Sequence, residues 1–126
     1  MRKQPRNKSL SGVCRIELER HLATSIIRLH GEFDVSAEQR FAEKLEAVLG
    51  ADTATVVLDL RGLTFMDSTG LRMLVTVNHA AERDGFDFAI LCDGGNVRQL
   101  LRDTGLDGIL PVVDPSGAVP PYEAES

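Results

Sequence analysis

The stretch from residue 55 to residue 80 constrains the fold more than any other part of the chain. Residues 56–60 form a near-continuous apolar run, which is typical of a strand covered on both faces. A short bend follows, and then residues 67–70, Asp-Ser-Thr-Gly. From Leu71 onward, apolar residues recur at the spacing of one buried helix face. The stretch therefore predicts a strand, a turn and a helix that begins within residues 67–70.

Two side chains with oxygen atoms stand where that helix begins. Asp67 or Ser68 can serve as the N-cap, because a short polar side chain accepts a hydrogen bond from a free backbone N–H of the first turn. The helix dipole also favours negative charge at this place. A serine hydroxyl here is a suitable position for a phosphate, although capping alone also explains the pattern.

Strands and helices alternate along the rest of the chain. Alternating or continuous apolar residues predict strands at residues 13–20, 25–33, 86–93 and 109–113. Helices are predicted between Ser36 and Gly50 and between Asn96 and Gly105. This order predicts an α/β fold with a mixed, mostly parallel sheet of about five strands, with helices in the crossovers. The short link after the first strand makes this N-terminal strand antiparallel to the second.

The two ends of the chain differ in composition from its middle. Residues 1–11 are basic, polar and without periodicity, so a disordered N-terminal tail is expected. Residues 115–126 contain three prolines and end in Glu-Ala-Glu-Ser, which favours a flexible tail. One domain is therefore expected over residues 12–114.

Charge and hydropathy argue against several kinds of partner. The net charge of −5 argues against nucleic acid as the main partner. No apolar run approaches the roughly 20 residues that span a bilayer, so no membrane partner is expected. The N-terminus lacks the apolar segment of a signal peptide, and we expect a cytoplasmic protein.

The histidines and cysteines show no metal-binding pattern. His21, His30 and His79 have no metal-ligand spacing with one another or with the cysteines, so neither a metal nor another cofactor is predicted. Cys14 and Cys92 both lie in strand-like runs with apolar neighbours. They fit free thiols of the core, or a redox-active disulfide if their Cα atoms lie within about 7 Å.

Asp34 stands at a second junction between a strand and a helix. Ser36 and Gln39 have the spacing of a capping box, which leaves Asp34 either to form a local turn or to contact a partner. Loops at the carboxyl ends of neighbouring parallel strands meet at one edge of a sheet. Asp34 and residues 67–70 are therefore expected on one rim, and this convergence favours a functional role over capping alone.

The predicted rim carries no motif of an enzyme. The sequence has no glycine-rich phosphate loop and no Gly-x-Ser-x-Gly around Ser68. No histidine is placed by the sequence to activate this serine as a nucleophile. Asp34 and Asp67 could form an acid/base pair or hold Mg²⁺, but no third ligand accompanies them. Binding is therefore favoured over catalysis.

Two stretches of the sequence resemble those of a known family. Residues 31–34, Gly-Glu-Phe-Asp, and residues 58–71, Leu-Asp-Leu-Arg-Gly-Leu-Thr-Phe-Met-Asp-Ser-Thr-Gly-Leu, resemble signature stretches of STAS domains, specifically of bacterial anti-sigma factor antagonists. The order of elements is also similar, and the resemblance covers roughly residues 12–114. It implies a STAS-like sheet and a protein that is not an enzyme.

The resemblance also implies partners and a switch. The chain is expected to bind an anti-sigma factor that has serine kinase activity, and thereby to release a sigma factor. The kinase is expected to phosphorylate Ser68, which ends binding, and a metal-dependent phosphatase of the PP2C type restores it. We expect a monomer or a weak dimer. The expected partner-binding residues are Asp34, Asp67, Thr69, Gly70 and Arg72.

Some alternatives stay open at this point. Thr69 is a rival phosphate acceptor. Arg72 stands where a small residue, often glycine, is usual in the family, and its cation could pair with the phosphate or affect the choice of kinase. The alternative function is a ligand-sensing or scaffolding STAS module of a signalling assembly, redox-gated through Cys14 and Cys92.

Overall fold

The computed structural model describes residues 13–113, and the tails predicted at residues 1–11 and 115–126 lie outside this part of the chain. The strands are β2 (Cys14–His21), β3 (Thr24–Phe33), β4 (Thr55–Met66), β5 (Asp87–Leu91) and β6 (Val112–Val113). The helices are α1 (Val35–Leu49), α2 (Ser68–Asp84) and α3 (Asn96–Asp103), and a short 3-10 helix, η1 (Leu106–Gly108), precedes β6. Among these described helices, none has the length and apolar character that crossing a membrane requires.

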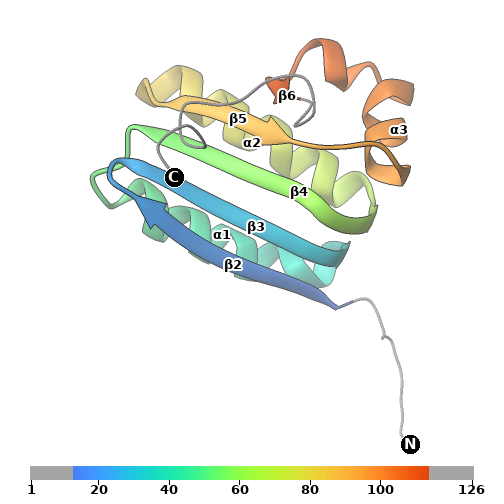
Figure 1. The fold of residues 1–126 in the computed structure, drawn as a ribbon, viewed down its shortest axis with the longest axis horizontal. Coiled ribbons are helices and arrows are strands. Elements are labelled where there is room, and N and C mark those ends of the chain that lie inside the picture. The colour runs from blue at the N-terminus through green and yellow to red at the C-terminus, as the bar shows by residue number, and fades with distance from the viewer. Residues whose placement is uncertain (1–12, 114–126) are drawn as a thin grey trace, which may run out of the picture.

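The strands form one sheet in the order β2-β3-β4-β5-β6 (Figure 1). β2 and β3 are antiparallel, whereas β3 with β4, β4 with β5, and β5 with β6 are parallel. The predicted α/β fold is therefore confirmed, including the mostly parallel sheet and its antiparallel N-terminal strand.

The main hydrophobic core lies between the sheet and its helices. α1 and α2 contact each other and lie over the same face of the sheet (Figure 1). The central strands contribute fully buried side chains to this core, among them Ile27, Leu29, Phe33, Leu58 and Leu60. The helices close it with further buried residues, among them Phe41, Leu74, Val77 and Leu101. This packing fixes the junctions at which β3 and β4 lead into α1 and α2.

The inward face of β2 is only partly buried. Cys14 lies in the core, and its carbonyl oxygen accepts a hydrogen bond from Arg40 of α1 at 2.8 Å. Leu18 is 44% exposed, although the alternation predicts that it points inward with Cys14. β2 is one of the two edge strands of the described sheet, so less of its length is covered by helices.

β4 is longer than the sequence pattern indicates. The apolar run predicts a strand at residues 56–60 followed by a bend, but β4 continues to Met66 and stays paired with β3. A Cβ atom at Gly62 would lie 2.4 Å from Nδ1 of His30. Gly62 therefore allows close approach of β3 and β4 within the sheet. The longer strand carries the chain directly to Asp67.

Two predicted boundaries near the end of the domain are wrong. The sequence places Asn96 as the N-cap of this helix, but Asn96 is the first residue of α3, and Gly95 holds the N-cap position without a side-chain hydrogen bond. The Asn96 side chain donates to the carbonyl oxygen of Thr64 at 3.4 Å. The last strand is limited to Val112–Val113, rather than residues 109–113, because the preceding chain forms η1.

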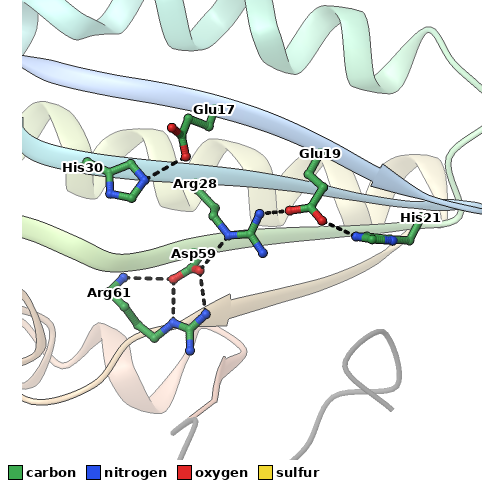
Figure 2. Close-up of polar contacts among 7 residues, drawn as sticks. All are labelled: Glu17, Glu19, His21, Arg28, His30, Asp59 and Arg61. Atoms are coloured by element: carbon green, nitrogen blue, oxygen red, sulfur yellow. Dashed lines mark hydrogen bonds and ion pairs between the residues drawn. The ribbon is translucent and has the colours of Figure 1, made fainter. Parts of the chain in front are cut away.

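The face of the sheet opposite the main core carries a network of charged side chains (Figure 2). Asp59 of β4 is 5% exposed and accepts hydrogen bonds from Nε and Nη2 of Arg61 at 2.9 and 2.8 Å. Arg28, its register partner on β3, lies 3.4 Å from Asp59 and also pairs with Glu19 of β2. His21 extends the network through its pair with Glu19, and Glu17 and His30 form a separate pair on the same face. These contacts link β2, β3 and β4 on the side away from α1 and α2.

Candidate functional site

β3 and β4 end side by side at one rim of the sheet. Phe33 pairs with Met66 at the last register position of the two strands. The Asp67 N–H then donates to the carbonyl oxygen of Phe33 at 3.2 Å. Asp34 and Asp67 are therefore the first residues after two neighbouring parallel strands, and each leads into a helix. The structure brings the two predicted stretches together on one rim.

Both aspartates are helix N-caps. Asp34 Oδ1 accepts hydrogen bonds from the N–H and the hydroxyl of Ser36 at 2.9 and 2.6 Å, and Asp67 Oδ1 accepts from the Thr69 N–H at 2.9 Å. Asp34 and not Ser36 caps α1, so the predicted Ser36 cap is wrong, whereas the local turn predicted for Asp34 fits its hydrogen bond from the Ser36 N–H. α1 begins at Val35, so the residue before it holds the cap position and Ser36 already supplies a first-turn N–H.

Ser68 and Thr69 differ in exposure although they are neighbours. Ser68 is the first residue of α2 and is exposed. Thr69 is only 7% exposed. A kinase must take the hydroxyl into its own active site, so this geometry favours Ser68 over Thr69 as a phosphate acceptor.

Gly70 lies in the interior of the same turn. A Cβ atom at this position would lie 2.3 Å from Cγ and 2.9 Å from Sδ of Met66. The absence of a side chain allows the first turn of α2 to pack closely on the end of β4. Gly70 therefore supports the rim from inside.

Arg72 connects the two helices of the rim. It stands one turn after Ser68 on α2, and its Nη2 atom lies 3.5 Å from Oε2 of Glu38 on α1. Both side chains are well exposed, at 65% for Arg72 and 49% for Glu38. Such an exposed pair stabilises the fold little, so each side chain can change partner at small cost.

Two exposed apolar side chains also belong to the rim, and neither is among the predicted site residues. Val35 directly follows Asp34 and is 67% exposed, and Phe65 lies just before Met66 and is 46% exposed. Aromatic side chains are enriched in protein-binding interfaces, although single exposed apolar residues such as Leu22 and Ile109 also occur elsewhere on this surface. The sequence signal for them is weak, because an apolar residue near the end of a strand is usually assigned to the core.

The carboxylates of the rim are already engaged in capping. Within residues 13–113, no group of three or more His, Cys, Asp or Glu side chains is arranged to hold a metal ion. Asp34 and Asp67 each use an Oδ1 atom to hold the first turn of a helix. The arrangement therefore presents two fixed negative charges beside an exposed hydroxyl.

Cys14 and Cys92 lie far apart in the sheet. Cys14 begins the edge strand β2, and Cys92 directly follows β5, with β3 and β4 between them. Neighbouring strands are about 4.8 Å apart, so about 14 Å separates the two positions. A disulfide needs Cα atoms within about 7 Å. Both are buried free thiols, and burial raises the pKa of each, to about 11 for Cys92. The structure therefore fits core thiols and argues against a disulfide between them.

Known proteins share both the sequence pattern and the fold. A family model described as STAS domain matches residues 15–117. The anti-sigma F factor antagonist of Paenibacillus polymyxa is 32% identical over 100 residues, which are 79% of this chain and 86% of the relative. The solved structure of the anti-sigma factor antagonist SpoIIAA in its unphosphorylated form gives a TM-score of 0.71 at 24% identity, and the match covers 88% of this chain and 93% of that one. The phosphorylated form of the Bacillus cell fate determinant SpoIIAA gives a TM-score of 0.66 at 23% identity, with 88% and 96% covered.

Proposed function

Since the chain belongs to the STAS domain family, we propose that it is an anti-sigma factor antagonist whose binding is ended by phosphorylation of Ser68. Its partner is an anti-sigma factor that has serine kinase activity, and binding releases a sigma factor. The name of the Paenibacillus polymyxa relative, which is similar over most of both chains, supports this function.

One observation carries the proposal. Ser68 is exposed at the first position of α2, next to the capping carboxylate of Asp67, while its neighbour Thr69 is buried. The hydroxyl is therefore within reach of a kinase and, when phosphorylated, of a PP2C-type phosphatase. The rim on which it stands also carries the exposed Val35 and Phe65, which suit contact with a protein.

A phosphate at Ser68 changes the rim while leaving the fold intact. It adds about −1.5 to −2 charge, which the N-terminus of a helix tolerates because the helix dipole is positive there. For a partner that docks on the rim, the phosphate adds repulsion and bulk beside the carboxylates of Asp34 and Asp67. Phosphorylation therefore works through the surface rather than through a change of fold.

Other features of the proposal follow from this binding role. The chain acts by docking and not by catalysis, and it needs no cofactor. We propose that it works in the cytoplasm as a monomer or weak dimer, because a kinase and a phosphatase must both reach the same rim.

A competition experiment tests the proposed function. The unphosphorylated chain is added to a preformed complex of the anti-sigma factor and its sigma factor, both from the source organism. We expect the sigma factor to be released, as followed by size-exclusion chromatography. A sigma factor that stays bound at saturating amounts of the chain would refute the antagonist function.

Replacing Phe65 with alanine is expected to weaken binding of the anti-sigma factor about tenfold, because exposed aromatic side chains often carry a large share of an interface energy. Isothermal titration calorimetry measures the change. Leu22→Ala is the matched control, since Leu22 is 83% exposed in the turn before β3, at the end of the sheet opposite the rim. We expect this variant to bind like the wild type. An equal loss of affinity in both variants would show that Phe65 is not a specific contact of the interface.

A hollow of about 770 Å³ between β2 and α1 supports a second candidate, a STAS module that senses a small ligand. Its lining combines apolar and charged side chains, among them Cys14, Ile16, Arg40 and Lys44. A ligand that binds only the folded chain raises its melting temperature. A screen of small molecules by thermal melting separates this candidate from the antagonist, whose activity needs no such ligand.

A further inference from the structure

Arg72 lies between the proposed phosphorylation site on α2 and the neighbouring helix α1. It shares α2 with Ser68, and it forms an ion pair with Glu38 of α1. The same two residues line a small groove between the helices, with a volume of about 170 Å³ and with Phe41, Leu45, Met73 and Val77 among its other lining residues. The ion pair therefore spans the groove between α1 and α2.

The spacing on α2 places Arg72 within reach of a phosphate on Ser68. Residues four positions apart lie on the same helix face, with Cβ atoms about 5–6 Å apart. An acidic group that precedes a basic one at this spacing is the more favourable order. The guanidinium group can also bind a phosphate through two hydrogen bonds at once.

The phosphate is the stronger of the two candidate partners for Arg72. It carries about −1.5 to −2 charge, against a single charge on Glu38. The existing pair is long, at 3.5 Å, and is exposed to solvent on both sides. Little stability is therefore lost when Arg72 leaves Glu38.

We propose that Arg72 exchanges Glu38 for the phosphate when Ser68 is phosphorylated; the inference rests on the proposed function of Ser68. The phosphate is then partly neutralised, and the carboxylate of Glu38 is left without Arg72. Phosphorylation at the start of α2 thereby leaves an unpaired negative charge at Glu38 on α1. It also removes the ion pair between Arg72 and Glu38 over the groove. Arg72 acts as a positioning residue, because through it the phosphate on α2 also changes the surface of α1.

The first measurement reads the contact between Arg72 and the phosphate. Phosphoserine is installed at position 68 during synthesis of the chain, so the experiment does not depend on the kinase. The second ionisation of the phosphate is followed by phosphorus NMR during a pH titration. Asp34, Asp67 and Glu38 face this region and favour the protonated form of the phosphate, whereas Arg72 favours the ionised form. We expect Arg72→Gln to lower the acid dissociation constant about threefold.

The control for this titration is Arg83→Gln. Arg83 lies at the far end of α2 and pairs with Asp84, so its loss should leave the phosphate unchanged. An equal acid dissociation constant in the wild type and the Arg72→Gln variant would overturn the proposal. So would an equal effect of both substitutions, because it would show a general loss of charge rather than a local contact.

The second measurement tests whether Arg72 leaves Glu38 when Ser68 carries a phosphate. A double-mutant cycle with Arg72→Gln and Glu38→Gln gives the coupling between the two residues in thermal melts. We expect a coupling of about 2 °C in the unphosphorylated chain and none in the chain with phosphoserine. The same coupling in both forms would overturn the exchange. Failure of the kinase to modify Ser68 would refute the proposed function, but it would leave both of these measurements readable.

Discussion

Replacing Ser68 with aspartate is expected to weaken binding of the anti-sigma factor by about a hundredfold, which is a loss of about 2.7 kcal/mol. The added carboxylate lies beside Asp67 on a rim that already holds Asp34. A partner that fits the unmodified rim therefore meets an extra negative charge. The melting transition should stay cooperative, because an acidic residue in the first turn of a helix is favourable. Isothermal titration calorimetry and thermal melts measure the two properties.

The matched control is Ser68→Asn, because asparagine has nearly the size and shape of aspartate but no charge. We expect its affinity to stay close to that of the wild type. A loss as large as that of Ser68→Asp would mean that bulk, and not charge, decides docking. An unchanged affinity of Ser68→Asp would contradict the switch.

Replacing Asp59 with asparagine is expected to lower the free energy of unfolding by about 2 kcal/mol at neutral pH. Asp59 is the buried centre of the network in Figure 2, and it accepts hydrogen bonds from Arg61 and lies next to Arg28. Asparagine removes the negative charge that Arg61 and Arg28 share at this position, while Arg28 keeps its pair with Glu19. Asp84→Asn is the control, because Asp84 pairs with Arg83 at the surface, where the loss of a pair changes stability little.

The contribution of Asp59 to the stability of the fold should be present at neutral pH and be lost in acid. Burial acts to raise the pKa of Asp59, but the hydrogen bonds and charge of Arg61, with the charge of Arg28, more than offset this and lower the pKa. A carboxyl group with a lowered pKa stabilises the fold above its unfolded value of about 3.9, and this contribution is lost as the pH falls through the folded value. In urea unfolding at a series of pH values, the gap between wild type and Asp59→Asn should therefore shrink below about pH 4. A constant gap would assign the effect to packing instead.

The order and direction of the strands could be predicted from periodicity, but several local boundaries could not. The apolar run at residues 56–60 identifies the central strand, because only a doubly covered strand needs it. The continuation of β4 to Met66 depends on pairing with β3, which local pattern does not report. The cap of α1 could not be identified for a similar reason: the spacing of Ser36 and Gln39 fits a capping box, and only the start of α1 at Val35 shows that Asp34 is the cap.

The rim that holds the candidate site could be located from the sequence, but its contacts could not. Residues 67–70 mark the rim because a strand, a polar turn and a helix follow one another directly. The exposure of Phe65 and the pair of Arg72 with Glu38 depend on how β4, α1 and α2 pack, so no local pattern reports them. The separation of Cys14 and Cys92 likewise depends on the order of the strands in the sheet.

The central claim is that Ser68 is the residue that a kinase modifies. The most direct test is the intact mass of the chain before and after incubation with the anti-sigma factor and ATP. The wild type is expected to gain the mass of one phosphate, and Ser68→Ala is expected to gain none, whereas Thr69→Ser should behave like the wild type. A phosphate on the Ser68→Ala protein, or no phosphate on the wild type, would contradict the account.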